Sequence, residues 1–103
     1  MAIVGMDKKN FFLDGQTAIV TGGASGIGLS TVRLLSSVGA HVIMVDINKE
    51  LGNELSEKFK SEDKKVEYIY CDVSSEASIL ELSEKIISKK VSIEILMHFA
   101  GIG

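Results

Sequence analysis

Glycines gather in one short segment of the chain, residues 21–28, with the sequence TGGASGIG. Glycine lets a backbone turn tightly and approach a bulky anion, and the start of a helix offers that anion free N–H groups and a positive dipole. The segment follows an apolar run and precedes a stretch of helical periodicity, so it predicts a diphosphate-binding loop. The alternative interpretation is a glycine turn that only links a strand to a helix.

The spacing of these glycines separates two well-known phosphate loops. A Walker A loop requires Lys followed by Ser or Thr after its last glycine, but Leu29 and Ser30 follow Gly28. The dinucleotide pattern G-x-G-x-x-G also fails, because Thr31 stands where its third glycine would be. The pattern present is T-G-x-x-x-G-x-G, which does not support ATP or GTP hydrolysis of the P-loop kind.

An acidic residue, Asp46, ends the second apolar run, 18 residues after Gly28. In dinucleotide folds, an acid about 20 residues past the glycines accepts hydrogen bonds from the adenosine ribose. Its charge would repel the 2′-phosphate of NADP, and the nearest cation is Lys49. We therefore predict NAD in preference to NADP. The alternative is that Asp46 only closes a turn before Asn48.

A second acid, Asp72, ends the third apolar run and is followed by Val73. Ligands of open parallel sheets lie beyond the carboxyl ends of the strands, so Asp72 is expected to meet the adenine amino group. Capping of the next helix is the alternative. The preceding Cys71 is expected to be a small buried residue. Since it is the single cysteine, no internal disulfide is possible, which favours a reducing cytosol.

These residues can act together only if a sheet brings the ends of their strands to one edge, and the sequence predicts such a sheet. Four apolar runs predict strands at residues 17–21, 41–47, 66–72 and 93–99, and helical periodicity begins at Gly26, after Asn48 and after Ser74 or Ser75. The order β-α-β-α-β-α-β predicts a Rossmann-type α/β fold, with four parallel strands in the order 3-2-1-4 and helices on both faces.

Helix boundaries and apolar stripes support this order. Gly39 is suited to end the first helix, because the residue after a helix often adopts a left-handed backbone. Asn48 is a suitable N-cap for the second helix. The apolar stripes of the second and third helices are predicted to be Leu51, Leu55, Phe59 and Ile79, Leu82, Ile86.

Composition limits the class of protein. The chain has 103 residues, of which 46% are hydrophobic and 24% charged, which is typical of one globular domain. The net charge is −3 and residues 49–65 carry balanced charges, so no basic stripe predicts a nucleic-acid partner. No apolar run approaches the ~18 residues of a membrane span, and the N-terminus does not resemble a targeting segment.

From about residue 11 onward, the chain resembles the N-terminal half of the short-chain dehydrogenase/reductase family. Residues 12–23 are similar to the family's opening, and residues 21–28 match its cofactor signature throughout. Asp46 matches the acid of its NAD-preferring members, and residues 72–73 match the pair that flanks adenine. Residues 100–101 match the Ala-Gly that follows the family's fourth strand.

The resemblance implies that residues 1–103 are an NAD(P)-binding domain, truncated relative to the family. The cofactor-binding residues that it implies are Gly22, Ser25, Gly26, Ile27, Gly28, Asp46, Ile47, Asp72, Val73, Ala100 and Gly101. No metal is expected.

The chain departs from the family pattern in two places. The family's fourth strand usually ends in two asparagines, which His98 and Phe99 replace. His98 either substitutes as a hydrogen-bonding group or marks a copy drifting from function. The family's catalytic Ser and Tyr-x-x-x-Lys lie downstream of that strand. Tyr68 and Tyr70 are not followed by lysine four residues on, so no residue here is assigned a catalytic role.

We therefore expect the NAD(H)-binding N-terminal portion of a cytoplasmic oxidoreductase. The family's reaction is hydride transfer between NAD and an alcohol or ketone, and a substrate would be bound only with a C-terminal half. The alternatives are a non-catalytic module that senses NAD or is completed by a partner, and an inactive remnant. The fourth strand is expected to be an exposed sheet edge that invites self-association.

Overall fold

The computed structural model describes residues 13–99, in which strands and helices alternate along the chain. The elements are β1 (Thr17–Thr21), α1 (Gly26–Ser37), β2 (His41–Asp46), α2 (Lys49–Ser61), β3 (Val66–Tyr70), α3 (Glu76–Ser88) and β4 (Ile95–His98). This is the predicted β-α-β-α-β-α-β order.

The strands form one parallel sheet in the order β3-β2-β1-β4, as predicted. Its register pairs Thr21 of β1 with Val45 of β2 and with His98 of β4. Asp46 at the end of β2 pairs with Tyr70 at the end of β3. The carboxyl ends of all strands therefore meet at one edge of the sheet, which is where the predicted site residues lie.

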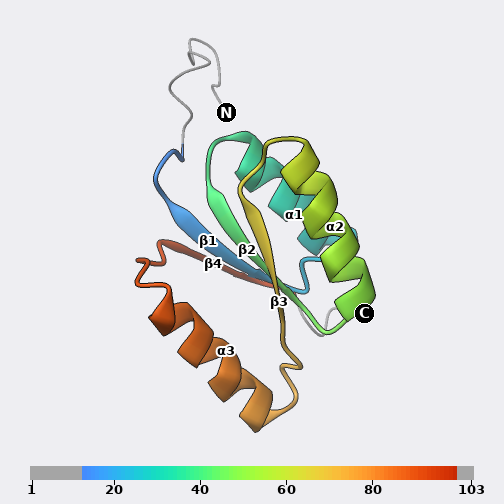
Figure 1. The fold of residues 1–103 in the computed structure, drawn as a ribbon, viewed down its shortest axis with the longest axis vertical. Helices are drawn as coiled ribbons and strands as arrows, with labels where there is room; N and C mark the ends of the chain where they lie inside the picture. Colours follow the sequence, from blue (N-terminus) through green and yellow to red (C-terminus); the bar gives the residue numbers. More distant parts are fainter. Residues whose placement is uncertain (1–12, 100–103) are drawn as a thin grey trace.

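Helices cover both faces of the sheet, with α1 and α2 on one face and α3 on the other (Figure 1). Side chains alternate between the faces, so Val20 and Met44 pack with Val32 of α1 and with Leu55 and Phe59 of α2. The other face carries a second cluster that includes Ile19, Ile43, Val45, Ile69 and Cys71. The strand β2 is buried on both faces, which explains its unbroken apolar run.

The helix α3 covers its face of the sheet less completely than the sequence predicts. Leu82 and Ile86 pack against the second cluster, but no residue of α3 is fully buried. Ile79, the third residue of the predicted stripe, is 42% exposed. It lies in the first turn of α3, which extends past the carboxyl ends of the strands in Figure 1, where the sheet offers little surface to cover it.

Local caps fix where the helices begin and end. The Asn48 side chain accepts a hydrogen bond from the Leu51 N–H at 3.1 Å, as predicted for an N-cap. Of the two serines considered for α3, Ser75 is the cap and accepts from the Ser78 N–H at 3.3 Å. Gly39 has a φ of +98°, the left-handed backbone expected after a helix.

Candidate functional site

The loop between β1 and α1 adopts a backbone that favours glycine. Gly22 has a φ of +69° and Gly26 a φ of +57°, both in the left-handed region. A Cβ added at Gly26 would meet no atom within 4 Å, so the space beside it is open. A Cβ at Gly28 would lie 1.9 Å from the Gly22 carbonyl oxygen, so the first turn of α1 packs directly on the loop.

The start of α1 is left uncapped by side chains. Ser25 is the N-cap residue, yet its hydroxyl makes no capping hydrogen bond, and the first turn contains no acidic residue. The first backbone hydrogen bond runs from the Leu29 N–H to the Ser25 carbonyl at 3.3 Å. The N–H groups before Leu29 therefore have no partner within the helix, and they stand at the positive end of its dipole. Such an end suits an anion.

Both carboxylate oxygens of Asp46 accept hydrogen bonds, one of them from the glycine loop. Its Oδ2 accepts a hydrogen bond from the Ala24 N–H at 3.0 Å, and its Oδ1 accepts from the Asn48 N–H at 2.9 Å. The second bond is the local turn that the sequence allowed, while the first joins the end of β2 to the glycine loop. An ionised carboxylate offers about four acceptor positions, so roughly two are left for hydroxyl groups of a ligand.

Tyr68 holds the main chain of Asp46 in place, a role that the sequence did not predict. Its hydroxyl donates to the main-chain oxygen of Asp46 at 2.8 Å. A Cβ at Gly52 would lie 2.2 Å from the Tyr68 ring, so α2 packs tightly on that ring. Burial, followed by the charges of Asp46 and Tyr70, raises the pKa of Tyr68 above its usual value of 10.0. A tyrosine 22 residues after Asp46 carries no local signal for this contact.

Asp72 lies at the same edge of the sheet, but one of its carboxylate oxygens is bonded within the turn that follows β3. Its Oδ1 accepts from the Ser74 N–H at 3.0 Å and from the Ser74 hydroxyl at 2.6 Å. These bonds, led by that from the hydroxyl, lower the pKa of Asp72 below its usual value of 3.8. Its Oδ2 makes no hydrogen bond to residues 13–99. Asp72 therefore closes the turn before α3 but does not cap that helix, whose N-cap is Ser75, and one of its oxygens is left for a further contact.

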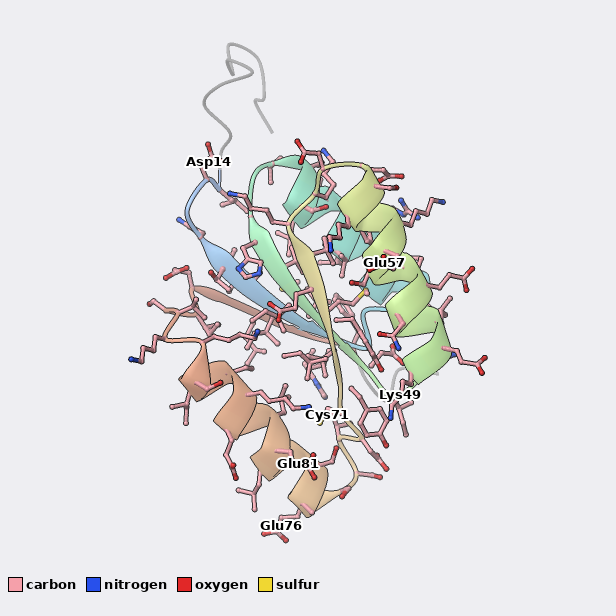
Figure 2. The ribbon with its side chains drawn as sticks, viewed as in Figure 1. Asp14, Lys49, Glu57, Cys71, Glu76 and Glu81 are labelled. Carbon is pink, nitrogen blue, oxygen red and sulfur yellow. The ribbon has the colours of Figure 1, made fainter. Side chains whose placement is uncertain are left out.

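Three large apolar side chains are exposed around this edge. Ile27 of the loop is 64% exposed, Ile47 after β2 is 57% exposed, and Val73 after β3 is 37% exposed. By contrast, the neighbouring Cys71, labelled in Figure 2, is 2% exposed, as predicted. Exposed apolar side chains next to hydrogen-bonding groups are a common feature of sites that hold flat organic rings.

His98 forms a hydrogen bond at the end of β4. Its Nδ1 lies 2.6 Å from the Thr21 Oγ1, which joins the ends of β4 and β1 beside the loop. The Phe99 N–H donates to the Thr21 carbonyl at 2.9 Å, which continues the same junction. The sequence left two interpretations of His98 open, and this contact agrees with its use as a hydrogen-bonding group. The predicted site residues Ala100 and Gly101 lie outside the described residues.

Residues 13–99 contain neither a candidate metal site nor a helix that could span a membrane. This part of the chain contains no group of three His, Cys, Asp or Glu side chains arranged to hold a metal ion. Its helices are also too short or too polar for any of them to cross a membrane.

Comparison with known proteins gives a consistent result. A family model described as short chain dehydrogenase matches residues 16–103. Short chain aldehyde dehydrogenase 1 of Euphorbia lathyris is 41% identical over 96 residues, which are 93% of this chain and 33% of the relative. The chain therefore spans a minor part of the length of this relative.

Solved structures share the fold. The RhlG/NADP active-site complex of Pseudomonas aeruginosa has a TM-score of 0.81 and 28% identity, covering 92% of this chain and 38% of that one. A short chain dehydrogenase/reductase of Burkholderia phymatum in complex with NAD has a TM-score of 0.75 and 22% identity, covering 84% and 31%. One of these structures holds NADP and the other NAD.

Proposed function

Because the chain belongs to the short-chain dehydrogenase family, we propose that it binds NAD as the N-terminal, cofactor-binding portion of an oxidoreductase. The proposed reaction is hydride transfer between NAD and an alcohol or ketone, with residues 1–103 as one NAD(P)-binding domain. When bound, NAD supplies the nicotinamide ring that accepts or donates the hydride. The residues of this chain bind and orient the cofactor, and none of them is assigned proton transfer.

The open loop supports binding of the cofactor diphosphate. Gly22 and Gly26 hold the loop in left-handed turns. The N–H groups from Ser25 to Gly28 have no hydrogen-bond partner among residues 13–99, and they would donate to phosphate oxygens. The open space beside the Gly26 Cα fits a bulky anion. The exposed side chain of Ile27 would then lie against the cofactor rather than in water.

The adenosine half is assigned to the ends of β2 and β3. Asp46 would accept from the ribose hydroxyls, and Ile47 and Val73 would contact the adenine ring. The Asp72 Oδ2 is a suitable acceptor for the adenine amino group. Ala100 and Gly101 are assigned to the cofactor through the family pattern that they match. The observation that carries the assignment is the 3.0 Å bond from the Ala24 N–H to the Asp46 carboxylate, which fixes the acid next to the loop.

NAD is proposed in preference to NADP on electrostatic grounds. The Asp46 carboxylate would repel a 2′-phosphate. The nearest cation in sequence, Lys49, has its Nζ 5.0 Å from the centre of the Tyr70 ring, an interaction that holds it on the outer side of β3. The cytosol is the proposed location, since the thiol of Cys71 is buried and unpaired with another cysteine.

Calorimetric titration with NAD tests the proposal. Gly26→Asp places a carboxylate at the phosphate position, and Asp46→Ala removes the ribose acceptor, so both variants are expected to lose measurable binding. Glu57→Ala, on the exposed side of α2, is the control and should bind as the parent does. Asp46→Asn keeps one acceptor oxygen without the charge, and should shift the ratio of NAD to NADP affinity by about tenfold toward NADP. Equal affinity in the parent and in both site variants would contradict the proposal.

A second candidate is an interaction module completed by a partner. It is favoured by the apolar side chains of β4, where Leu96 is 66% and Met97 37% exposed. An apolar strand at the edge of a sheet invites pairing with another chain. A partner chain or a second copy would cover this edge, and the NAD site would serve as a sensor. Association through β4 that NAD strengthens or weakens would favour this candidate.

A further inference from the structure

The open edge of β3 carries a hollow that the cofactor site does not use. Its volume is about 390 Å³, and it lies between α2 and α3. Residues from both helices and from β3 line it, so it follows the strand edge and reaches around to both faces of the sheet. Figure 1 shows β3 passing between the two helices at this side of the molecule.

The backbone at this edge has hydrogen-bonding groups that face away from the sheet. β3 has a strand neighbour only on the β2 side within the described sheet. The Lys65 carbonyl accepts from the Val42 N–H at 2.8 Å, and the Cys71 N–H donates to the Asp46 carbonyl at 3.3 Å. Peptide groups alternate in direction along a strand, so those of Tyr68 and Tyr70 point outward. Such groups require water or another strand as partner.

The hollow has lysines on both faces of the strand edge. Lys49 begins α2 and lies over the Tyr70 ring, and Lys85 is in the last turn of α3. The one acid of the lining, Glu67, is paired with Lys89 and lies 3.5 Å from the His41 Nε2. Neither Lys49 nor Lys85 forms a salt bridge with any residue from 13 to 99. Figure 2 shows Lys49 at the start of α2, beside the end of β3.

These features together suit one kind of partner. Side chains of an added strand alternate between the two faces of a sheet, so they would reach Lys49 on one face and Lys85 on the other. We propose that the edge of β3 binds an extended, acidic peptide segment of another protein by strand addition. The main chain of the segment would pair with Tyr68 and Tyr70, and its carboxylates would pair with the two lysines. A second copy fits poorly, because two such edges would bring lysines together.

Fluorescence anisotropy with a defined peptide tests this proposal on the whole chain. The probe is a fluorescein-labelled, acetylated peptide of eight residues, Glu-Glu-Thr-Thr-Glu-Glu-Thr-Thr, which places carboxylates on both faces of a strand and is used at low ionic strength. Lys49→Gln and Lys85→Gln are each expected to weaken binding about two- to fivefold, as for exposed charge pairs, with the loss shrinking in high salt. Lys60→Gln is the matched control, since Lys60 lies in the last turn of α2 outside the hollow, and it should bind as the parent does.

Two further peptides separate strand addition from simple attraction of charge. A peptide with N-methylated alternate amides keeps its carboxylates but cannot pair along the edge, and it should bind at least about tenfold more weakly. A peptide of Gln and Thr tests the need for charge and should also bind weakly. Equal binding of the N-methylated peptide, or an equal effect of Lys60→Gln and Lys85→Gln, would overturn the proposal. So would dimerisation of the chain through β3. NAD titration is independent of all these outcomes.

Discussion

At the residue scale, the site depends on a few backbone positions that favour glycine. Gly28 and Gly26 both belong to the loop, but for different physical reasons. A Cβ at Gly28 would collide with the main chain at Gly22, whereas a Cβ at Gly26 would enter open space on a left-handed backbone. Close packing therefore requires glycine at Gly28, whereas the backbone conformation favours it at Gly26.

Alanine substitutions should reveal this difference. Gly28→Ala is expected to lower the free energy of unfolding by about 3 kcal/mol, because the clash is with backbone that cannot move aside. Gly26→Ala should cost only about 1 kcal/mol, the price of a left-handed alanine. Urea denaturation monitored by circular dichroism measures both. Equal losses in the two variants would show that close packing of α1 on the loop is not the reason for glycine at Gly28.

Tyr68 adds a pH dependence at alkaline pH. Its pKa is raised in the folded chain above the usual 10.0, so folding favours the protonated hydroxyl. The stabilisation is fully present below pH 10 and is lost as the pH rises through the folded pKa. Tyr68→Phe should remove this alkaline loss, although it also removes the bond to Asp46. Tyr70→Phe should keep most of the alkaline loss, because the charge of Tyr70 is the smallest of the three causes of the raised pKa. Denaturation midpoints between pH 8 and 11 provide the measurement. The same alkaline loss in Tyr68→Phe as in the parent would refute this role.

At the element scale, the three helices begin in two different ways. Asn48 and Ser75 cap α2 and α3 through side-chain hydrogen bonds, while Ser25 leaves α1 uncapped. The uncapped helix is the one that faces the proposed cofactor site. We therefore expect a ligand, rather than a side chain, to accept hydrogen bonds from the N–H groups in the first turn of α1.

Cap removal tests this contrast. Asn48→Ala and Ser75→Ala should each lower the free energy of unfolding by about 1 kcal/mol, because each removes a bond to a helix N–H. Ser25→Ala should have a much smaller effect in the absence of cofactor, since no such bond is present to lose. Chemical denaturation of the three variants side by side gives the comparison. A loss for Ser25→Ala as large as for Asn48→Ala would mean that Ser25 caps α1 in solution.

The elements were largely predictable from sequence, whereas contacts between them were not. The strand at Thr17–Thr21 and the cap at Asn48 follow from local residue types, and the structure confirms both. β3 ends at Tyr70, before the predicted residue 72, because Asp72 turns the chain with Ser74. The bond from Ala24 to Asp46 and that between Thr21 and His98 depend on how distant segments close together. Periodicity carries no information about such contacts.

At the scale of the whole molecule, the apolar surface is uneven. One face of the sheet is covered by α1 and α2, while α3 and β4 leave large apolar side chains exposed on the other side of the molecule. Leu96 of β4 is 66% exposed, and Ile87 of α3 is 74% exposed. Apolar side chains gathered in this way favour contact with further protein.

Self-association should therefore depend on β4. The chain is expected to sediment as a concentration-dependent oligomer, and Leu96→Lys should shift it to monomer, because the added charge cannot be buried at a strand edge. Leu34→Lys is the control, since Leu34 has a similar exposure of 59% but belongs to α1. Analytical ultracentrifugation over a wide concentration range measures the effect. A monomeric parent chain at every concentration would contradict this expectation.

Amide NMR during titration with NAD tests the central claim most directly, because it reports on the loop residue by residue. If the loop holds the diphosphate and Asp46 the ribose, the largest shifts will fall on the N–H groups of Ala24 to Gly28 and of Asn48, with small shifts in the last turn of α2. NAD-dependent shifts that avoid the loop, or none at millimolar NAD in a folded chain, would contradict the account.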